Sequence, residues 1–328
     1  MHETTETPHV PVNHQLVRHL NKGWPKRATV CSIEKFQVED NFDPHKPDYP
    51  VCMLPFFHHP RFQQVDEALK SEVLTWGWIG YNRRTVAAEE YVVNPALAVI
   101  SRQFLGENDW HFKEAMQQTL VDEHYHTLMH MKAVERTKEQ RDIQRELQLP
   151  RSVTYHRLQS LHAKLPEQWQ KDLASIAFAV VAEISVNAYL DTLAGDASIQ
   201  PQNRRVAELH NHDEYAHSKV IAEIGKVMYA NMDQQHRKFF IQVLPEALHA
   251  FVAQDYSMWE AILSQLCIPG AEGIIADTKN AAGNGVIMRD YGGLHRFATE
   301  IGILDEIDFD FTGTLNEKKG APAQPLPQ

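Results

Sequence analysis

The chain has 328 residues, of which 43% are hydrophobic, and its net charge is −11 with the 19 histidines neutral. This acidic balance, without a long basic run, argues against a nucleic-acid partner and against docking on an anionic membrane. The three cysteines, Cys31, Cys52 and Cys267, lie far apart with no C-x-x-C spacing, so neither a disulfide framework nor a thiolate zinc site is expected.

Residues 1–60 are rich in proline and histidine and show no sustained period. They predict an N-terminal arm of loops and short helices that wraps the core. The first residues lack the basic and apolar regions of a secretory signal, and no apolar run approaches the roughly 20 residues of a membrane span. A cytoplasmic protein with no membrane partner is therefore the simplest interpretation.

Helical periodicity dominates after this arm and predicts a single domain over residues 61–312, followed by a disordered tail at 313–328. The segment 139–166 is long enough to cross a bundle from end to end. One long crossover is typical of ferritin-like proteins, so the predicted fold class is all-α, with a ferritin-like four-helix-bundle core and additional flanking helices. The helices are expected at about residues 64–92, 109–139, 167–195, 202–231 and 234–266.

Two of the predicted helices carry the pattern D-E-x-x-H, as DEHYH at 122–126 and DEYAH at 213–217. A glutamate and a histidine three residues apart share one helix face. The helix before each pattern carries a glutamate in apolar surroundings, Glu89 in the first pair and Glu183 in the second. Seven apolar residues precede Glu183, and a buried unpaired carboxylate would cost several kcal/mol. A cation is therefore expected to face it.

Two such helix pairs bring carboxylates and imidazoles together in a bundle core, which is the pattern of di-iron and di-manganese carboxylate proteins. Four glutamates neutralise two divalent cations, and mixed oxygen and nitrogen donors favour iron or manganese. Asp122 and Asp213 are candidates to accept the free ring N–H of the ligand histidines, although exposed helix acids are the alternative. The predicted ligands are Glu89, Glu123, His126, Glu183, Glu214 and His217.

A further histidine, His210, lies one turn before Glu214 on the same helix face. A ferritin-like site does not require it. A neutral imidazole would raise the coordination of one metal ion without changing the net charge, and so would alter how that ion handles oxygen-derived ligands.

Four segments resemble the non-haem di-iron arylamine N-oxygenases, a family that includes amine-oxidising enzymes of the aureothin and chloramphenicol pathways. They are WIGYNRRTVAAEE at 78–90, VDEHYHTLMHM at 121–131, VAEISVNA at 181–188 and LHNHDEYAH at 209–217. The similarity extends from about residue 45 to FDF near 309. By this resemblance His210 joins the six ligands above, and the substrate is held by Tyr81, Arg84 and Asn187, with Thr85 and Ala88 as further candidates to line the pocket.

The resemblance implies two iron ions, O2 as co-substrate and an external electron donor. It also implies oxidation of an arylamine, bearing a carboxylate, through hydroxylamine and nitroso stages to the nitro compound in secondary-metabolite (antibiotic) biosynthesis. Arg84 is placed to pair with such a carboxylate, although a surface salt bridge is the alternative. A homodimer is expected, and whether the arylamine is free or tethered to a carrier protein stays open.

Three other classes of protein remain open at this point. A ferritin-like ferroxidase would use similar ligands, and a radical-generating reductase subunit would need a redox tyrosine, for which Tyr125 and Tyr215 are the candidates. A non-enzymatic helical scaffold is the third.

Overall fold

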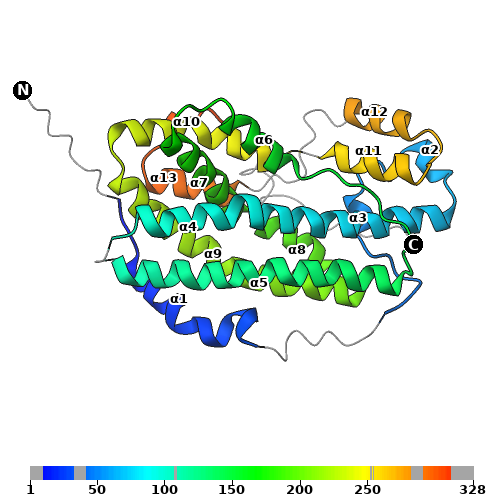
Figure 1. The fold of residues 1–328 in the computed structure, drawn as a ribbon, viewed down its shortest axis with the longest axis horizontal. Helices are drawn as coiled ribbons and strands as arrows, with labels where there is room; N and C mark the ends of the chain where they lie inside the picture. The colour runs from blue at the N-terminus through cyan, green and yellow to red at the C-terminus, as the bar shows by residue number, and fades with distance from the viewer. Residues whose placement is uncertain are drawn as a thin grey trace, which may run out of the picture.

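The computed structural model describes residues 10–32, 42–106, 109–251, 253, 255–281 and 291–311. Within these ranges the chain forms helices and connecting loops without a strand, so the predicted all-α class is confirmed (Figure 1). The tail predicted at 313–328 lies outside the described residues.

Four long helices form the core bundle. α3 packs against α5, α7 packs against α9, and α5 contacts α9 across the bundle (Figure 1). The crossover between α5 and α7 contains one short helix, α6, which lies over α7 and α10. The bundle helices are α3 (Glu67–Ala88), α5 (Trp110–Gln140), α7 (Gln168–Ser185) and α9 (Pro201–Asn231).

Shorter helices flank this bundle on several sides. α1 packs on α5 and α9, α10 and α13 cover α7, and α11 contacts both α3 and α12. The flanking α-helices are α1 (His14–Arg27), α2 (Pro60–Gln63), α4 (Asn94–Gln103), α6 (Val153–His162), α8 (Asn187–Gly195), α10 (Gln234–Phe251), α11 (Tyr256–Gln265), α12 (Ala271–Ala281) and α13 (Gly292–Glu300). The short turns are η1 (Thr29–Cys31), η3 (Val51–Met53), η4 (Glu89–Val93) and η6 (Leu304–Glu306).

The predicted helices at 109–139 and 202–231 agree closely with α5 and α9. The prediction of a single helix over 234–266 is wrong, because α10 ends at Phe251 and α11 begins at Tyr256. Asp255 causes α11 to begin there, since its side chain accepts a hydrogen bond from the Ser257 N–H at 3.1 Å and caps the new helix.

The helix predicted to end near residue 92 continues to Gln103 through a π-helical turn, η4. Pro95 has no N–H to donate to the carbonyl of Tyr91. The helix widens by one residue instead of ending, and the Asn94 N–H donates to the Glu89 carbonyl. Such bulges frequently mark functional sites, and this one begins at Glu89.

The predicted helix at 167–195 is divided at Val186 into α7 and α8. Over Gln168–Gly195, 28 residues, this segment is long and apolar enough by composition to cross a membrane, a run that sequence analysis did not recognise. However, 72% of its most apolar window is buried in the fold. Its apolar character follows from a central position against α9, α10 and α13.

The hydrophobic core is divided into two clusters of buried residues. One surrounds α7, α10 and α13, with Phe178 and Phe297 among its largest members. The other surrounds the first half of α3 together with α11, and it includes Trp76 and Trp259. Along α3, α5 and α9 the segment that separates the two clusters is buried but polar. The fold therefore surrounds a band of charged side chains with apolar packing at both ends.

Gly293 of α13 lets that helix approach the residue that follows Glu183. A Cβ at Gly293 would lie 2.8 Å from the carbonyl oxygen of Ile184 and 2.7 Å from its Cγ2. Gly293→Ala is expected to lower the free energy of unfolding by about 1–3 kcal/mol, because backbone atoms cannot move aside cheaply. Gly23→Ala in α1, where nothing lies within 4 Å, is the control and should not destabilise. Equal urea midpoints for the two variants would contradict this account.

Candidate active site

Side chains from α5, α7, α9 and the π turn η4 that continues α3 meet in the polar band. We call them the carboxylate–histidine cluster: Glu89, Glu123, His126, Glu183, His210, Glu214 and His217. Each is at most 6% exposed. Two overlapping groups in this cluster offer ligand atoms that lie within 4.8 Å of one another, and each group could hold a metal ion. The groups are Glu123, His126, His210, Glu214 and Glu123, Glu183, Glu214, His217.

Glu123 and Glu214 belong to both groups and lie between two histidines, so we call them the central glutamates. Nδ1 of His126 is 3.2 Å from Glu123 Oε2 and 3.3 Å from Glu214 Oε1. Nδ1 of His217 is 2.6 Å from Glu123 Oε1 and 3.3 Å from Glu214 Oε1. Both imidazoles thus direct Nδ1 toward the same pair of carboxylates. This arrangement is what two metal ions that share these carboxylates would require.

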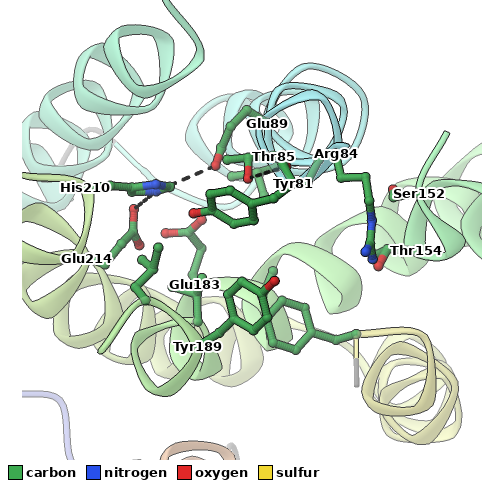
Figure 2. Close-up of a pocket in the computed structure, with 16 residues that line it drawn as sticks. Tyr81, Arg84, Thr85, Glu89, Ser152, Thr154, Glu183, Tyr189, His210 and Glu214 are labelled. Carbon is green, nitrogen blue, oxygen red and sulfur yellow. Dashed lines mark hydrogen bonds and ion pairs between the residues drawn. The ribbon is translucent and has the colours of Figure 1, made fainter. Parts of the chain in front are cut away.

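The other three residues occupy the ends of the cluster. His210 Nε2 lies 3.1 Å from Glu214 Oε1 and 4.0 Å from Glu89 Oε1, as Figure 2 shows. Glu183 Oε2 lies 4.0 Å from His217 Nδ1. The sequence-predicted residues are therefore gathered at one buried point.

Three glutamates of the cluster each keep one buried oxygen without a hydrogen-bond partner. These atoms are Oε2 of Glu89, Oε2 of Glu183 and Oε2 of Glu214. An unsatisfied buried carboxylate oxygen is costly, and coordination to a cation removes that cost. The donor set, hard oxygens with imidazole nitrogens, fits two divalent transition-metal ions.

Burial and mutual interactions shift the pKa values of the cluster residues. Burial and the neighbouring Glu123 raise the pKa of Glu89 well above its ordinary value, and burial with Glu123 does the same to Glu183. Burial opposes the charge of Glu123, but His126 and His217 outweigh it and lower its pKa to about 2. Against burial, the central glutamates raise the pKa values of both histidines. The shifts of Glu89 and Glu183 thus disfavour further negative charge, while those of His126 and His217 favour positive charge beside the central glutamates.

Asp122 and Asp213 lie directly behind the histidines and are 1% and 0% exposed, so neither is an exposed helix acid. Nε2 of His217 lies 3.0 Å from Asp122 Oδ2, and Nε2 of His126 lies 3.2 Å from Asp213 Oδ2. The pairing is crossed, because each aspartate orients the histidine of the opposite helix. A carboxylate at Nε2 keeps the proton there and leaves Nδ1 facing the central glutamates.

Helix α1 and turn η1 supply the partners of both aspartates, which sequence reasoning missed. The Trp24 indole N–H donates to Asp122 at 2.9 Å, and the Thr29 backbone N–H donates to Asp213 at 3.2 Å. Nη1 of Arg27 lies 3.3 Å from Asp213, and its Nη2 lies 4.0 Å from Asp122. A segment more than 90 residues away along the chain thus fixes both aspartates, and no local pattern could signal it.

His210 is also held from behind. Its Nδ1 lies 2.8 Å from Nε2 of His130, whose Nδ1 lies 2.7 Å from Asn82 Oδ1. The Asn82 amide donates to the carbonyl of Trp78 at 2.7 Å. Burial and His126 lower the pKa of His210, which keeps it neutral with a lone pair for a cation. His130 falls on the face of His126, one turn on, so helical spacing could have found it.

A cavity of about 140 Å³ opens beside the cluster. Figure 2 shows His210 and Glu214 at one end and Arg84, Ser152 and Thr154 at the other. The Nε atom of Arg84 is 3.6 Å from Oδ2 of the buried Asp255, and the Arg84 side chain is 23% exposed. Sequence-predicted residues on the lining are Tyr81, Arg84, Thr85 and Ala88. Lining residues that sequence reasoning missed include Ser152, Thr154, Val186, Tyr189, Leu190 and Phe251.

Asn187 is not among the residues that line this cavity. Its amide donates to Asn211 at 2.9 Å, and Asn211 donates to Asp191 at 2.6 Å. α7 ends at Ser185 and α8 begins at Asn187, so the helix that carries Glu183 does not continue unbroken to Asn187.

The fold and the cluster define an all-α protein whose bundle core contains carboxylates and imidazoles compatible with a metal centre, beside a cavity. Comparison with known proteins is more specific. The family model for the p-aminobenzoate N-oxygenase AurF matches residues 11–302. The chain is also 39% identical to a 4-aminobenzoate N-oxygenase of Streptomyces thioluteus over 296 residues, 89% of this chain and 88% of that protein.

The chain therefore belongs to the p-aminobenzoate N-oxygenase AurF family, and it is an oxygenase. The family resemblance stated from the sequence is confirmed.

Metal binding is expected to release protons. In the metal-free cluster Glu89, Glu183, His126 and His217 have raised pKa values, and each must give up its proton to coordinate a cation. Affinity for a divalent cation should thus rise with pH, and binding should release protons. Titration calorimetry in buffers of different ionisation enthalpy measures the number of protons released, and metal binding without proton release would refute these raised pKa values.

The same shifts set the pH dependence of the metal-free protein. The pKa values of His126 and His217 are raised in the folded state, so their stabilising contribution is complete below the ordinary value of 6.5 and is lost as pH rises through the folded-state values. The raised acids Glu89 and Glu183 act in the same direction. Urea unfolding of metal-free protein should therefore show stability that falls above neutral pH. A stability that increases there would contradict the prediction.

Proposed function

We propose that this protein is an O2-dependent non-haem di-iron N-oxygenase that converts a carboxylate-bearing aromatic amine to its nitro compound through hydroxylamine and nitroso stages. The observation that carries the proposal is one cavity with the carboxylate–histidine cluster at one end and the Arg84 guanidinium at the other. The relative described as a 4-aminobenzoate N-oxygenase supports the substrate class.

Within this proposal the seven cluster residues are the ligands of two iron ions, and Asp122 and Asp213 orient the two ligand histidines. Four glutamates balance two Fe(II) ions, and neutral imidazoles with hard oxygens suit iron. The iron pair would supply activation of O2, and His210 would give one ion an additional nitrogen donor. Every remaining contribution is one of binding and positioning by the protein.

The cavity would hold the substrate by its acid group. The guanidinium of Arg84 would pair with that carboxylate, beside the hydroxyl-bearing Ser152 and Thr154. Asp255 lies behind Arg84 and would keep it directed into the cavity. The ring would lie between apolar side chains such as Leu190 and Phe251, so that the amine points toward the cluster.

Tyr81 would contribute a hydrogen bond at the metal end of the cavity. Its hydroxyl is buried without a hydrogen-bond partner, and burial raises its pKa, so the phenol stays protonated. Its ring stacks on Tyr189 at 5.7 Å, and the Tyr189 hydroxyl pairs with Tyr49 at 2.7 Å. The proposed substrate roles of Thr85 and Ala88 are to shape the wall beside Glu89, whereas Asn187 would act only through its contact with Asn211.

Electron balance requires a donor. Conversion of an amine to a nitro group with two O2 molecules, which also yields two waters, consumes two further electrons and two protons. An external reductant is therefore part of the proposal. The proposal also includes a cytoplasmic location, a homodimer and a role in secondary metabolism. The arylamine would be free or tethered to a carrier protein. The chain would form one di-iron domain over residues 61–312, with an arm before it and a tail after it.

The alternative functions would not require every feature of this site. An iron-storing ferroxidase has no need for a cavity that ends in an arginine paired with a buried aspartate. A radical-generating subunit would need a redox tyrosine near the metals, and Tyr215 is 48% exposed and donates to Asp191 instead. Electron paramagnetic resonance of the iron-loaded protein after O2 exposure tests the radical alternative. Iron uptake in large excess over the protein would favour storage.

Oxidation of arylamines is the direct test of the proposed function. Reduced protein loaded with iron is exposed to O2 with a panel of para-substituted anilines, and products are followed by mass spectrometry. Hydroxylamino, nitroso and nitro products are expected with acidic anilines such as 4-aminobenzoate. Protein carrying Glu183→Ala should retain the fold but form none. Iron-dependent O2 consumption without any oxidised aniline would contradict the proposal.

Removal of the arginine tests how the substrate is held. Arg84→Gln is expected to raise KM for an acidic aniline about tenfold or more, since a hydrogen bond to a charged group is worth ~1.5–3 kcal/mol, and to change KM for a neutral aniline little. Arg83→Gln is the matched control, because Arg83 pairs with Glu146 at 2.6 Å and does not line this cavity. Equal changes for acidic and neutral substrates would exclude the clamp.

A further inference from the structure

A short hydrogen-bonded chain joins the protein surface to the cluster. The partly exposed indole of Trp24 donates to Asp122 Oδ2 at 2.9 Å, and the same oxygen lies 3.0 Å from Nε2 of His217. Nδ1 of that imidazole faces the central glutamates. Two hydrogen bonds that share one oxygen atom therefore separate an aromatic ring at the surface from a proposed iron ligand.

The connections behind the other two histidines differ from this one. His126 reaches Asp213, whose further partners are the backbone N–H of Thr29 and the guanidinium of Arg27. His210 reaches His130 and Asn82 and ends at a backbone carbonyl inside the core. Of these three connections among the described residues, the one through Trp24 thus ends on a partly exposed aromatic ring.

The helix that carries Trp24 is basic, although the protein as a whole has a net charge of −11. The sequence of α1, HQLVRHLNKGWPKR, contains four Lys and Arg residues and no acid. Arg18, Lys22 and Lys26 are exposed on it. Glu114 lies beside the middle of the helix, where it accepts from Asn21 at 3.2 Å, and three of the four basic residues, Lys22, Lys26 and Arg27, follow Asn21 around Trp24. In Figure 1 α1 lies along the lower edge of the bundle, on the opposite side from α10 and α6.

We propose that the exposed basic face of α1 docks a small acidic one-electron carrier protein, of the iron–sulfur or flavin type, and that electrons enter the metal centre through Trp24, Asp122 and His217. The inference rests on the proposed di-iron function. In each transfer the carrier loses one electron and one Fe(III) becomes Fe(II), and two transfers restore the diferrous state. No bond is broken, and Trp24 serves as the coupling medium without itself being oxidised. Opposite charges guide the carrier to the ring that leads inward.

The test is the rate at which the diferric protein is reduced, followed by stopped-flow absorbance. The reductants are a reduced plant-type ferredoxin, which is an acidic protein, and dithionite, a small ion that needs no docking site. Trp24→Phe removes the indole N–H and should slow the limiting rate with ferredoxin several-fold. Rates are expressed per bound iron, and the ferredoxin rate should fall several-fold more than the dithionite rate. Trp169→Phe, at a partly exposed indole on α7, is the control and should be neutral.

A second variant tests docking without touching the metal centre. Reversal of two exposed charges, Lys22→Glu with Lys26→Glu, should raise the ferredoxin concentration needed for half-maximal rate about tenfold and leave the limiting rate unchanged. Lys238→Glu on α10 is the matched control and should have no effect. Added salt should weaken the ferredoxin reaction of the unchanged protein and reduce the difference from the double variant.

The outcomes separate this inference from the proposed function. If Trp24→Phe leaves the ferredoxin rate unchanged, or slows both reductants equally through a loss of iron, Trp24 has only a structural role and the electron path is refuted. If the double reversal has no effect, the docking face is refuted. Neither result alters arylamine oxidation by chemically reduced protein, which is a separate measurement. A protein that binds no iron would overturn the proposed function and this inference together.

Discussion

The mutual repulsion and desolvation of four glutamates buried at one point is the constraint on which the rest of this structure depends. Three of them, Glu89, Glu183 and Glu214, keep an oxygen without a hydrogen-bond partner, and such a group is tolerated inside a protein only if protons or cations compensate it. Two apolar clusters, one on each side of the polar band, stabilise the bundle and keep the acids in place. Apolar packing at the ends of the bundle thus stabilises the fold, so the middle of the bundle can contain charged and reactive side chains.

The orientation of His126 and His217 depends on contacts between separate helices. Asp122 and Asp213 hold Nε2 of His217 and His126 across the interface between α5 and α9, so these two helices must pack in register for either ring to be positioned. The aspartates in turn need the donors of α1 and η1. The N-terminal region is therefore part of the active site, although none of its residues belongs to the carboxylate–histidine cluster.

The sequence predicted the elements of this design that depend on local spacing. The Glu-x-x-His pairs, the acid embedded after seven apolar residues and the long crossover all follow from helical periodicity and composition, and the predicted all-α class and family agree with what is found. Predictions failed where a helix breaks or bulges. The capping side chain of Asp255 divided one predicted helix, Pro95 produced a π turn, and the break at Val186 divided a second predicted helix into α7 and α8. Contacts such as those of Trp24 and Arg27 join segments distant in the chain, and no periodicity encodes them.

The central claim is that this cluster exists to hold two metal ions that share the carboxylates of Glu123 and Glu214. Anomalous diffraction at the iron edge from crystals of the iron-loaded protein tests it most directly. The account predicts two iron peaks about 3.5–4 Å apart, the spacing of two-metal sites, each bonded to Nδ1 of one of the paired histidines and to a central glutamate. A single iron peak would contradict it. Iron bound elsewhere, with the cluster carboxylates protonated or paired with histidines instead of bound to metal, would also contradict it.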